Sequence, residues 1–230
     1  MFDLKNFQNF LKTMPRQELL KEAFTHRTYA VEHNLTYDNQ RLEFLGDAVV
    51  DTILSEYIFL LYTDLPEGDL TKLRSALVCE SALAQLARKI NLSEDLRIGH
   101  GENESGGAFR DSTLADLFEA VFGAIYLACG LDTCREWLTE LFSEEFPDPR
   151  QMLVKVNPKG KLQELSQHFW NCTPAYRVFS QSGPQHDPVY EVEVMLRQWV
   201  ARGSGKNRKA AEGDAARSLY NYLHKKGIRF

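Results

Sequence analysis

Cysteine is scarce in the sequence and is never closely paired. The chain has four cysteines, Cys79, Cys129, Cys134 and Cys172, and no two of them form a C-x-x-C motif. Zinc knuckles and small disulfide-stapled domains both need closely spaced cysteines, so neither class is expected. We predict reduced thiols that are mostly buried.

Long hydrophobic runs are missing as well. A bilayer-spanning helix needs about 20 consecutive apolar residues, and no run approaches that length. The first ten residues, MFDLKNFQNF, lack the basic-then-apolar order of a secretory signal. With 43% apolar and 26% charged residues, the 230-residue chain has the composition of a globular protein with one large or two modest domains. We expect a cytoplasmic protein without a membrane partner.

Basic residues are scarce in the first two thirds of the chain. Up to Pro149 there are 13 Lys and Arg against 26 Asp and Glu, whereas from Arg150 onward there are 14 against 6. The sign changes within EEFPDPRQ, residues 144–151, where two prolines interrupt the helical periodicity. We predict an acidic domain at 1–148, a linker at 149–156 and a basic domain at 157–227. The basic domain is the part expected to bind a polyanion.

The spacing of apolar residues indicates a fold class for each domain. Before the boundary, apolar residues recur three and four positions apart, which predicts an all-α domain. After it, a helical segment is followed by alternating stretches and a second helical segment. This order predicts a small α+β domain with the arrangement α-β-β-β-α.

One long apolar segment carries acids but no base to pair with them. The stretch NQRLEFLGDAVVDTILSEYIFLLY holds Glu43, Asp47 and Asp51 at four-residue spacing, and the next base after Arg41 is Lys72. A solvated helix face would usually pair such acids with Lys or Arg one turn away. These acids lack that local partner.

A second apolar segment repeats this feature. Asp116 and Glu119 lie one turn apart in STLADLFEAVFGAIYLACG, again without a base. Gly123 falls on the same helix side as these acids, and Gly46 falls beside Glu43 on the first segment. Small residues at these positions would let the two helices cross closely and bring four carboxylates together.

Converging carboxylates would either share protons or bind cations. All-oxygen ligands suit Mg²⁺ or Mn²⁺, and neither helix has an E-x-x-H pair that would indicate a di-iron bundle. The alternative is an acidic helix face that is simply solvated.

The basic domain has a candidate phosphate site before its last helix. In GSGKNRKAAEGDAA, Lys206, Arg208 and Lys209 surround Asn207, the predicted N-cap. Free backbone N–H groups at a helix N-terminus and three cations favour phosphate binding, although a solvated basic turn would have the same pattern. Three further candidates are Gln163 and Gln167, on one helix face, and His186, in a loop between strands.

These segments resemble a known family. RLEFLGDAVVD is similar to the signature of the ribonuclease III family, and AFTHRTYA, LPEGDLTKLRSALV and LADLFEAVFGAIYLACG resemble further family blocks in the same order. The tail from NPKGKLQEL to GSGKNRKAAEGDAA resembles a double-stranded RNA-binding domain. The resemblance covers almost the whole chain and implies the bacterial two-domain form.

The resemblance implies roles for the acids. Glu43, Asp116 and Glu119 would ligate Mg²⁺, which Mn²⁺ could replace, and Asp47 and Glu119 would be the catalytic carboxylates. Asp51 has no family role and is interpreted as a structural or rim charge. Two accessory positions are Glu67 and Gln40, where many members of the family carry Glu.

The resemblance also implies a substrate and an assembly. Gln163, Gln167 and His186 would contact the minor groove of duplex RNA, and the segment 206–209 would contact phosphates across the major groove. A homodimer through the catalytic domain would cut both strands, leaving 5′-phosphate and 3′-hydroxyl ends, in the processing of ribosomal RNA precursors and other structured transcripts.

Two other functions fit parts of the sequence. A non-catalytic double-stranded RNA-binding regulator would have lost one or more metal carboxylates, and all four are present here. A metal phosphohydrolase that does not act on RNA would leave the basic domain without a purpose.

Overall fold

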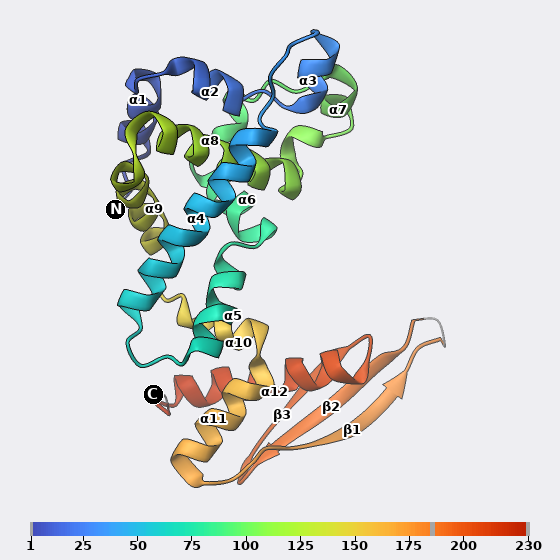
Figure 1. The fold of residues 1–230 in the computed structure, drawn as a ribbon. Coiled ribbons are helices and arrows are strands. Elements are labelled where there is room, and N and C mark those ends of the chain that lie inside the picture. Colours follow the sequence, from blue (N-terminus) through green and yellow to red (C-terminus); the bar gives the residue numbers. More distant parts are fainter. Residues whose placement is uncertain (1, 185–186, 229–230) are drawn as a thin grey trace. The chain divides into compact units, whose positions relative to one another are not determined.

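Two long apolar helices, α4 (Gln40–Leu61) and α8 (Asp111–Cys129), cross in the N-terminal part of the chain (Figure 1). The structure is a computed structural model and describes residues 2–184 and 187–228. Both helices bury apolar residues at three-and-four spacing, as predicted. The other helices before residue 150 are α1 (Leu4–Thr13), α2 (Gln17–Ala23), α3 (Arg27–Glu32), α5 (Glu67–Leu77), α6 (Glu80–Lys89), η1 (Leu92–Asp95), α7 (His100–Glu104), η2 (Gly107–Phe109) and α9 (Leu131–Glu145).

Glycines set the close approach of α4 and α8. A Cβ on Gly46 would lie 1.8 Å from the carbonyl oxygen of Glu119, and one on Gly123 would lie 2.3 Å from the carbonyl oxygen of Leu42. No side chain fits at either position unless the helices separate. The prediction that small residues let these helices cross closely is confirmed.

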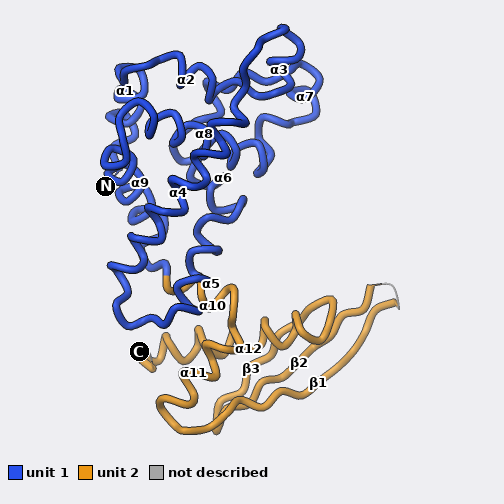
Figure 2. Tube along the Cα trace, in the orientation of Figure 1, with its two compact units in different colours: residues 1–149 blue, residues 150–230 orange. Residues whose placement is uncertain are grey.

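The chain divides into two compact units, Met1–Pro149 and Arg150–Phe230 (Figure 2). Residues that were expected to form a linker include a short helix, α10 (Arg150–Val156), which belongs to the second unit. The domain limits 1–148 and 157–227 stay a prediction.

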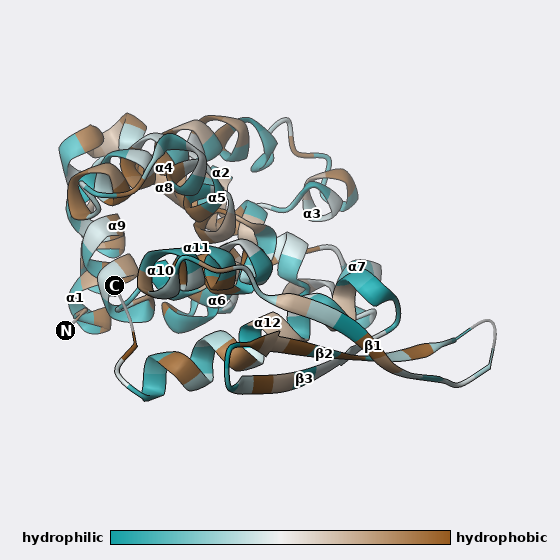
Figure 3. Cartoon of the chain, turned by 90° about the horizontal axis from the view of Figure 1, so that it is seen from below, coloured by the Kyte–Doolittle hydropathy of each residue, from teal (hydrophilic) through white to brown (hydrophobic). Residues whose placement is uncertain are grey.

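The second unit has the predicted α-β-β-β-α order. After α10 come α11 (Pro158–Trp170), β1 (Ala175–Ser182), β2 (Val189–Leu196), β3 (Trp199–Gly205) and α12 (Arg208–Lys225), and the strands form an antiparallel sheet in the order β1-β2-β3. Hydrophobic residues recur along β2 (Figure 3), and Val194 and Leu196 pack with Leu162, Leu219 and other apolar residues of the two helices. The fold class predicted for both parts of the chain is thus confirmed.

Apolar residues lie in different surroundings along α8 and at the end of α4. By length and composition, α8 is long and apolar enough to cross a membrane, the one such helix among the described residues. It is largely buried, as the core helix of a folded unit is. Phe59, Leu60 and Leu61 are exposed at the end of α4.

Candidate functional site

Three of the four predicted carboxylates meet where α4 and α8 cross. Oxygen atoms of Glu43, Asp116 and Glu119 all lie within 4.8 Å of one another, and all three side chains are half-buried. Each acid faces inward because it shares a helix side with a glycine of the crossing, Gly46 or Gly123. The sequence prediction of convergence therefore holds for these three.

Burial and mutual repulsion act together on this cluster. Burial, and after it the charges of Asp47, Asp116 and Glu43, raise the pKa of Glu119 to about 8. The pKa of Glu43 is raised for the same reasons, first by burial and then by Asp116. Burial also raises the pKa of Asp116, against a lowering by His26. The cluster is short of positive charge.

The two remaining acids of α4 lie beside the cluster. Asp47 is exposed, and its charge raises the pKa of both Glu119 and Glu43. Asp51 is half-buried, and its Oδ1 atom is buried without a hydrogen-bond partner among the described residues. The charge of Asp51 also raises the pKa of Glu119, so Asp51 interacts electrostatically with the site.

These residues fit a hard divalent cation. The three converging donors are carboxylate oxygens, which Mg²⁺ and Mn²⁺ prefer. A cation would offset the repulsion that raises the pKa values. Zinc is a poorer match, because no Cys or His belongs to the group.

The two predicted accessory residues do not belong to this cluster. Gln40 is exposed at the start of α4, where its backbone N–H donates to Asp38 at 3.1 Å. Glu67 is exposed in the first turn of α5 and accepts a hydrogen bond from Thr71 at 3.0 Å. Both remain available for contacts outside the chain.

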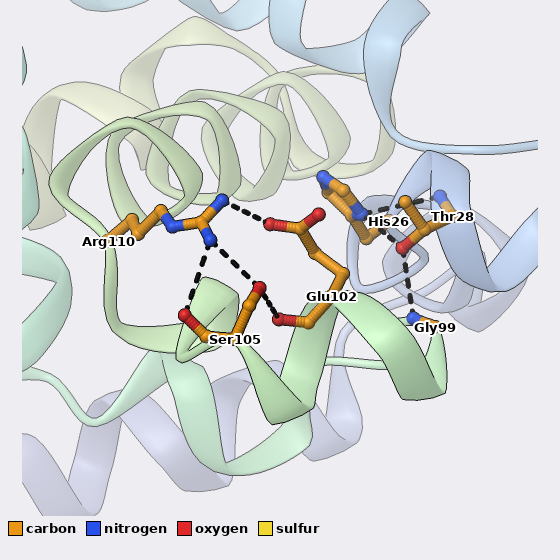
Figure 4. Close-up of polar contacts among 6 residues, drawn as sticks. All are labelled: His26, Thr28, Gly99, Glu102, Ser105 and Arg110. Carbon is orange, nitrogen blue, oxygen red and sulfur yellow. Dashed lines mark hydrogen bonds and ion pairs between the residues drawn. The ribbon is translucent and has the colours of Figure 1, made fainter.

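Sequence reasoning missed His26, which lowers the pKa of Asp116. The Thr28 backbone N–H donates to Nδ1 of His26 at 3.3 Å. The Thr28 hydroxyl lies 2.7 Å from the same Nδ1 and accepts from the Gly99 N–H at 2.9 Å (Figure 4). The only sequence signal was the block AFTHRTYA, because nothing local relates His26 to α8.

A second network shapes the loop before α8. Arg110, the residue that precedes the helix, pairs with Glu102 at 2.5 Å and donates to the Ser105 hydroxyl at 2.9 Å (Figure 4). These contacts fix the start of the helix that carries Asp116 and Glu119.

In the second unit, Asn207 caps α12 as predicted. Its side chain accepts from the Ala210 N–H at 2.9 Å. Lys206, Arg208 and Lys209 are all exposed around this cap. Arg208 also donates from Nε to Glu212 at 2.9 Å, a contact that the sequence did not indicate.

Two of the three residues predicted to contact the RNA groove lie on α11. Gln163 and Gln167 are both exposed on α11, and Gln167 donates to Asn171 at 2.6 Å. His186 lies outside the described residues.

Comparison with known proteins covers both units. The family Ribonuclease-III-like matches residues 16–145, and the double-stranded RNA binding motif matches residues 158–223. The chain is 42% identical over 210 residues to Ribonuclease 3 of Natranaerobius thermophilus, with 90% of this chain and 91% of the relative covered. It is also 42% identical over 212 residues to Ribonuclease 3 of Symbiobacterium thermophilum, with 92% and 90% covered.

A solved structure resembles the first unit. The nuclease domain of Ribonuclease III from Campylobacter jejuni superposes with a TM-score of 0.57 at 36% identity, covering 63% of this chain and 99% of that domain. The description of that structure refers to a region involved in dimer formation.

Proposed function

Because the chain belongs to the ribonuclease III family, we propose that its carboxylate cluster binds Mg²⁺ and hydrolyses double-stranded RNA to products with 5′-phosphate and 3′-hydroxyl ends. Family membership and the RNA-binding motif together make the chain a double-strand-specific endoribonuclease. The observation that carries the proposed mechanism is the meeting of Glu43, Asp116 and Glu119 within 4.8 Å.

Each carboxylate has a proposed role. Glu43, Asp116 and Glu119 hold the cation, because their oxygens converge in a half-buried space without a basic partner. Bound there, Mg²⁺ would supply the Lewis acidity that lowers the pKa of water and stabilises charge on the leaving oxygen. Asp47 is exposed beside the cluster, so its carboxylate can accept a hydrogen bond from water at the rim.

Glu119 would couple cation binding to proton release. Its pKa of about 8 means that the carboxyl holds a proton near neutral pH when no cation offsets the neighbouring acids. A carboxylate must be deprotonated to act as a ligand, so cation binding should become tighter as the pH rises. Asp47 contributes to this coupling through its charge on Glu119.

The second unit supplies the attraction for RNA. The segment from Arg150 onward carries 14 basic against 6 acidic residues, whereas the first unit is strongly acidic and would repel a polyanion. Gln163, Gln167 and the segment 206–209 are exposed and available for the duplex. Affinity should therefore fall steeply as salt rises.

A homodimer is part of the proposal. Phe44 on α4 is 80% exposed, and Phe59 and Leu60 on the same helix are 65% and 67% exposed. Large exposed apolar side chains of this kind favour burial against another protein surface. Replacing Phe44 with Asp should shift the sedimentation coefficient toward the monomer; a Phe44→Asp chain that sediments like wild type would exclude this part of α4 from the interface.

Cytoplasmic processing of ribosomal RNA precursors and other structured transcripts is the proposed cellular role. Duplex RNA in precursor transcripts is the substrate class that the RNA-binding motif and the nuclease unit would share.

A cleavage assay tests the enzymatic proposal. A labelled long RNA duplex is incubated with wild type, Glu119→Gln and the control Glu140→Gln, in Mg²⁺ and in EDTA, beside single-stranded RNA and duplex DNA. Glu140 is an exposed acid on α9, away from the cluster. We expect Mg²⁺-dependent cutting of duplex RNA alone, retained in Glu140→Gln and lost in Glu119→Gln. Tight duplex binding without cutting by wild type in Mg²⁺ or Mn²⁺ would instead indicate a binding regulator.

A further inference from the structure

A buried carboxylate joins the N-terminal ends of α11 and α12 in the second unit. Glu212, on α12, accepts from Nζ of Lys159 at 2.5 Å and from Nε of Arg208 at 2.9 Å. Lys159 belongs to α11, 53 residues before Glu212 in the sequence. The two ion pairs therefore hold one cation from each helix on a single acid.

The ends of the two helices are fixed next to each other by more than these ion pairs. Asn157 caps α11 by accepting from the Gly160 N–H at 3.2 Å, as Asn207 caps α12. Pro158, the first residue of α11, lies 3.5 Å from the position that a Cβ on Gly213 would take. The first turn of α11 thus packs on α12 close to Glu212.

An aromatic ring supports Lys159. Nζ of Lys159 lies 4.6 Å from the centre of the Tyr176 ring, on β1, a distance suited to a cation–π contact. The ring and the carboxylate together restrict the ammonium group to one position. A flexible side chain that is already fixed loses less entropy when it binds a ligand.

The acid is nearly buried, whereas its two cations are exposed. The side chain of Glu212 is 12% exposed, whereas those of Lys159 and Arg208 are 44% and 64% exposed. Arg208 donates to Glu212 from Nε, and within the described part of the chain its terminal nitrogens have no recorded hydrogen bond, so they can donate to a ligand. The cations face solvent and the acid lies behind them.

We infer that Lys159 is an additional phosphate-binding residue for duplex RNA, and that Glu212 is a positioning residue that holds Lys159 and Arg208 together toward the RNA backbone. This inference rests on the proposed function. It extends the predicted phosphate surface from the start of α12 to the start of α11.

The positioning role and a purely electrostatic role predict opposite effects. If Glu212 acted only through its negative charge, Glu212→Gln would remove repulsion and tighten binding to RNA. If Glu212 positions the two cations, the same change releases both side chains and weakens binding. The sign of the change in affinity decides between the two.

The same unit contains a matched control. Glu193 on β2 is also almost buried between two cations, Arg177 at 2.5 Å and Arg202 at 3.2 Å. Strand alternation places it on the sheet face opposite Val192 and Val194, which lie in the core. Glu193→Gln therefore breaks an equivalent ion-pair arrangement without touching the helix ends.

The test is duplex affinity of the full chain over a series of KCl concentrations. A short blunt RNA duplex is titrated in EDTA with wild type, Glu212→Gln, Lys159→Gln and Glu193→Gln, and thermal unfolding is followed for each chain. Lys159→Gln leaves Glu212 paired with Arg208, so it tests the inference even if Glu212→Gln does not fold.

We expect Glu212→Gln to weaken binding about tenfold and Glu193→Gln to leave it unchanged. Lys159→Gln should lower the slope of log affinity against log salt by about one, as the loss of one phosphate contact does. Equal or tighter binding by Glu212→Gln, or an unchanged slope in Lys159→Gln, would overturn the inference alone. Failure of the wild-type chain to bind duplex RNA would overturn both the inference and the proposed RNA binding.

Discussion

Replacing Gly46 with alanine should separate the two helices that carry the carboxylates. The new Cβ would lie 1.8 Å from the carbonyl oxygen of Glu119 and 2.5 Å from its carbonyl carbon, whereas ordinary contacts begin at 3.4 Å. The helices would have to part by up to about 1.6 Å, the difference between 3.4 and 1.8 Å, because the obstacle is backbone and cannot rotate away.

The expected cost is large but leaves the chain folded. Inserting one methyl group into a packed core costs about 1–3 kcal/mol, and a clash with backbone belongs at the upper end. A typical domain has a free energy of unfolding of about 5–15 kcal/mol, so folding should survive. The cleavage rate should fall more strongly than the stability, because a displacement of about 1 Å among catalytic groups lowers the rate about 100-fold.

Urea unfolding and duplex cleavage measure the two effects separately. Gly68→Ala is the matched control, because Gly68 lies in helix α5 with nothing within 4 Å of its added Cβ. That substitution should leave cleavage unchanged and stability equal or higher by about 0.5 kcal/mol. If Gly46→Ala unfolds at the wild-type urea concentration and cuts at the wild-type rate, then the close crossing does not position the cluster.

Three further outcomes follow from the structure. In EDTA, the free energy of unfolding should fall as the pH rises from about 4.5 to 8, because the raised pKa of Glu119 keeps a proton on its carboxyl in the folded chain that the unfolded chain has already released. Urea titrations of Glu119→Gln should show a flatter pH dependence. Tyr176→Phe should leave stability unchanged or raise it by up to about 1 kcal/mol, since the Tyr176 hydroxyl is buried without a partner among the described residues; a clear loss of thermal stability would contradict this. Cys134 is fully buried with a pKa raised to about 12 by that burial, so native protein should resist maleimide at this thiol until it is unfolded, and rapid labelling followed by mass spectrometry would disprove its burial.

Local pattern was enough to predict the elements and their inward faces. Helical periodicity, strand alternation and the change of charge sign depend only on residues a few positions apart, and the α-β-β-β-α order followed from them. The acids and glycines of α4 and α8 share helix sides by spacing alone, so their convergence was predictable once the two helices were assumed to meet.

The polarity of a residue does not by itself predict its burial, which depends on the neighbouring elements. The apolar residues Phe59, Leu60 and Leu61 are exposed, although hydrophobicity favoured the core, because a helix end can extend beyond the elements that would cover it. Glu193 lies on the sheet face away from the core, yet this acid is nearly buried because two arginines from neighbouring strands cover it.

The two-part organisation, the fold of each part and the acids that face inward could all be predicted from the residue pattern, because they follow from short-range periodicity and composition. Which of those acids share a site, the effect of His26 on Asp116, and the pairing of Glu212 with Lys159 from 53 residues away became known from the packed fold. A helix face specifies which residues must be buried but leaves open what will lie against them, and that pairing is fixed when distant segments pack.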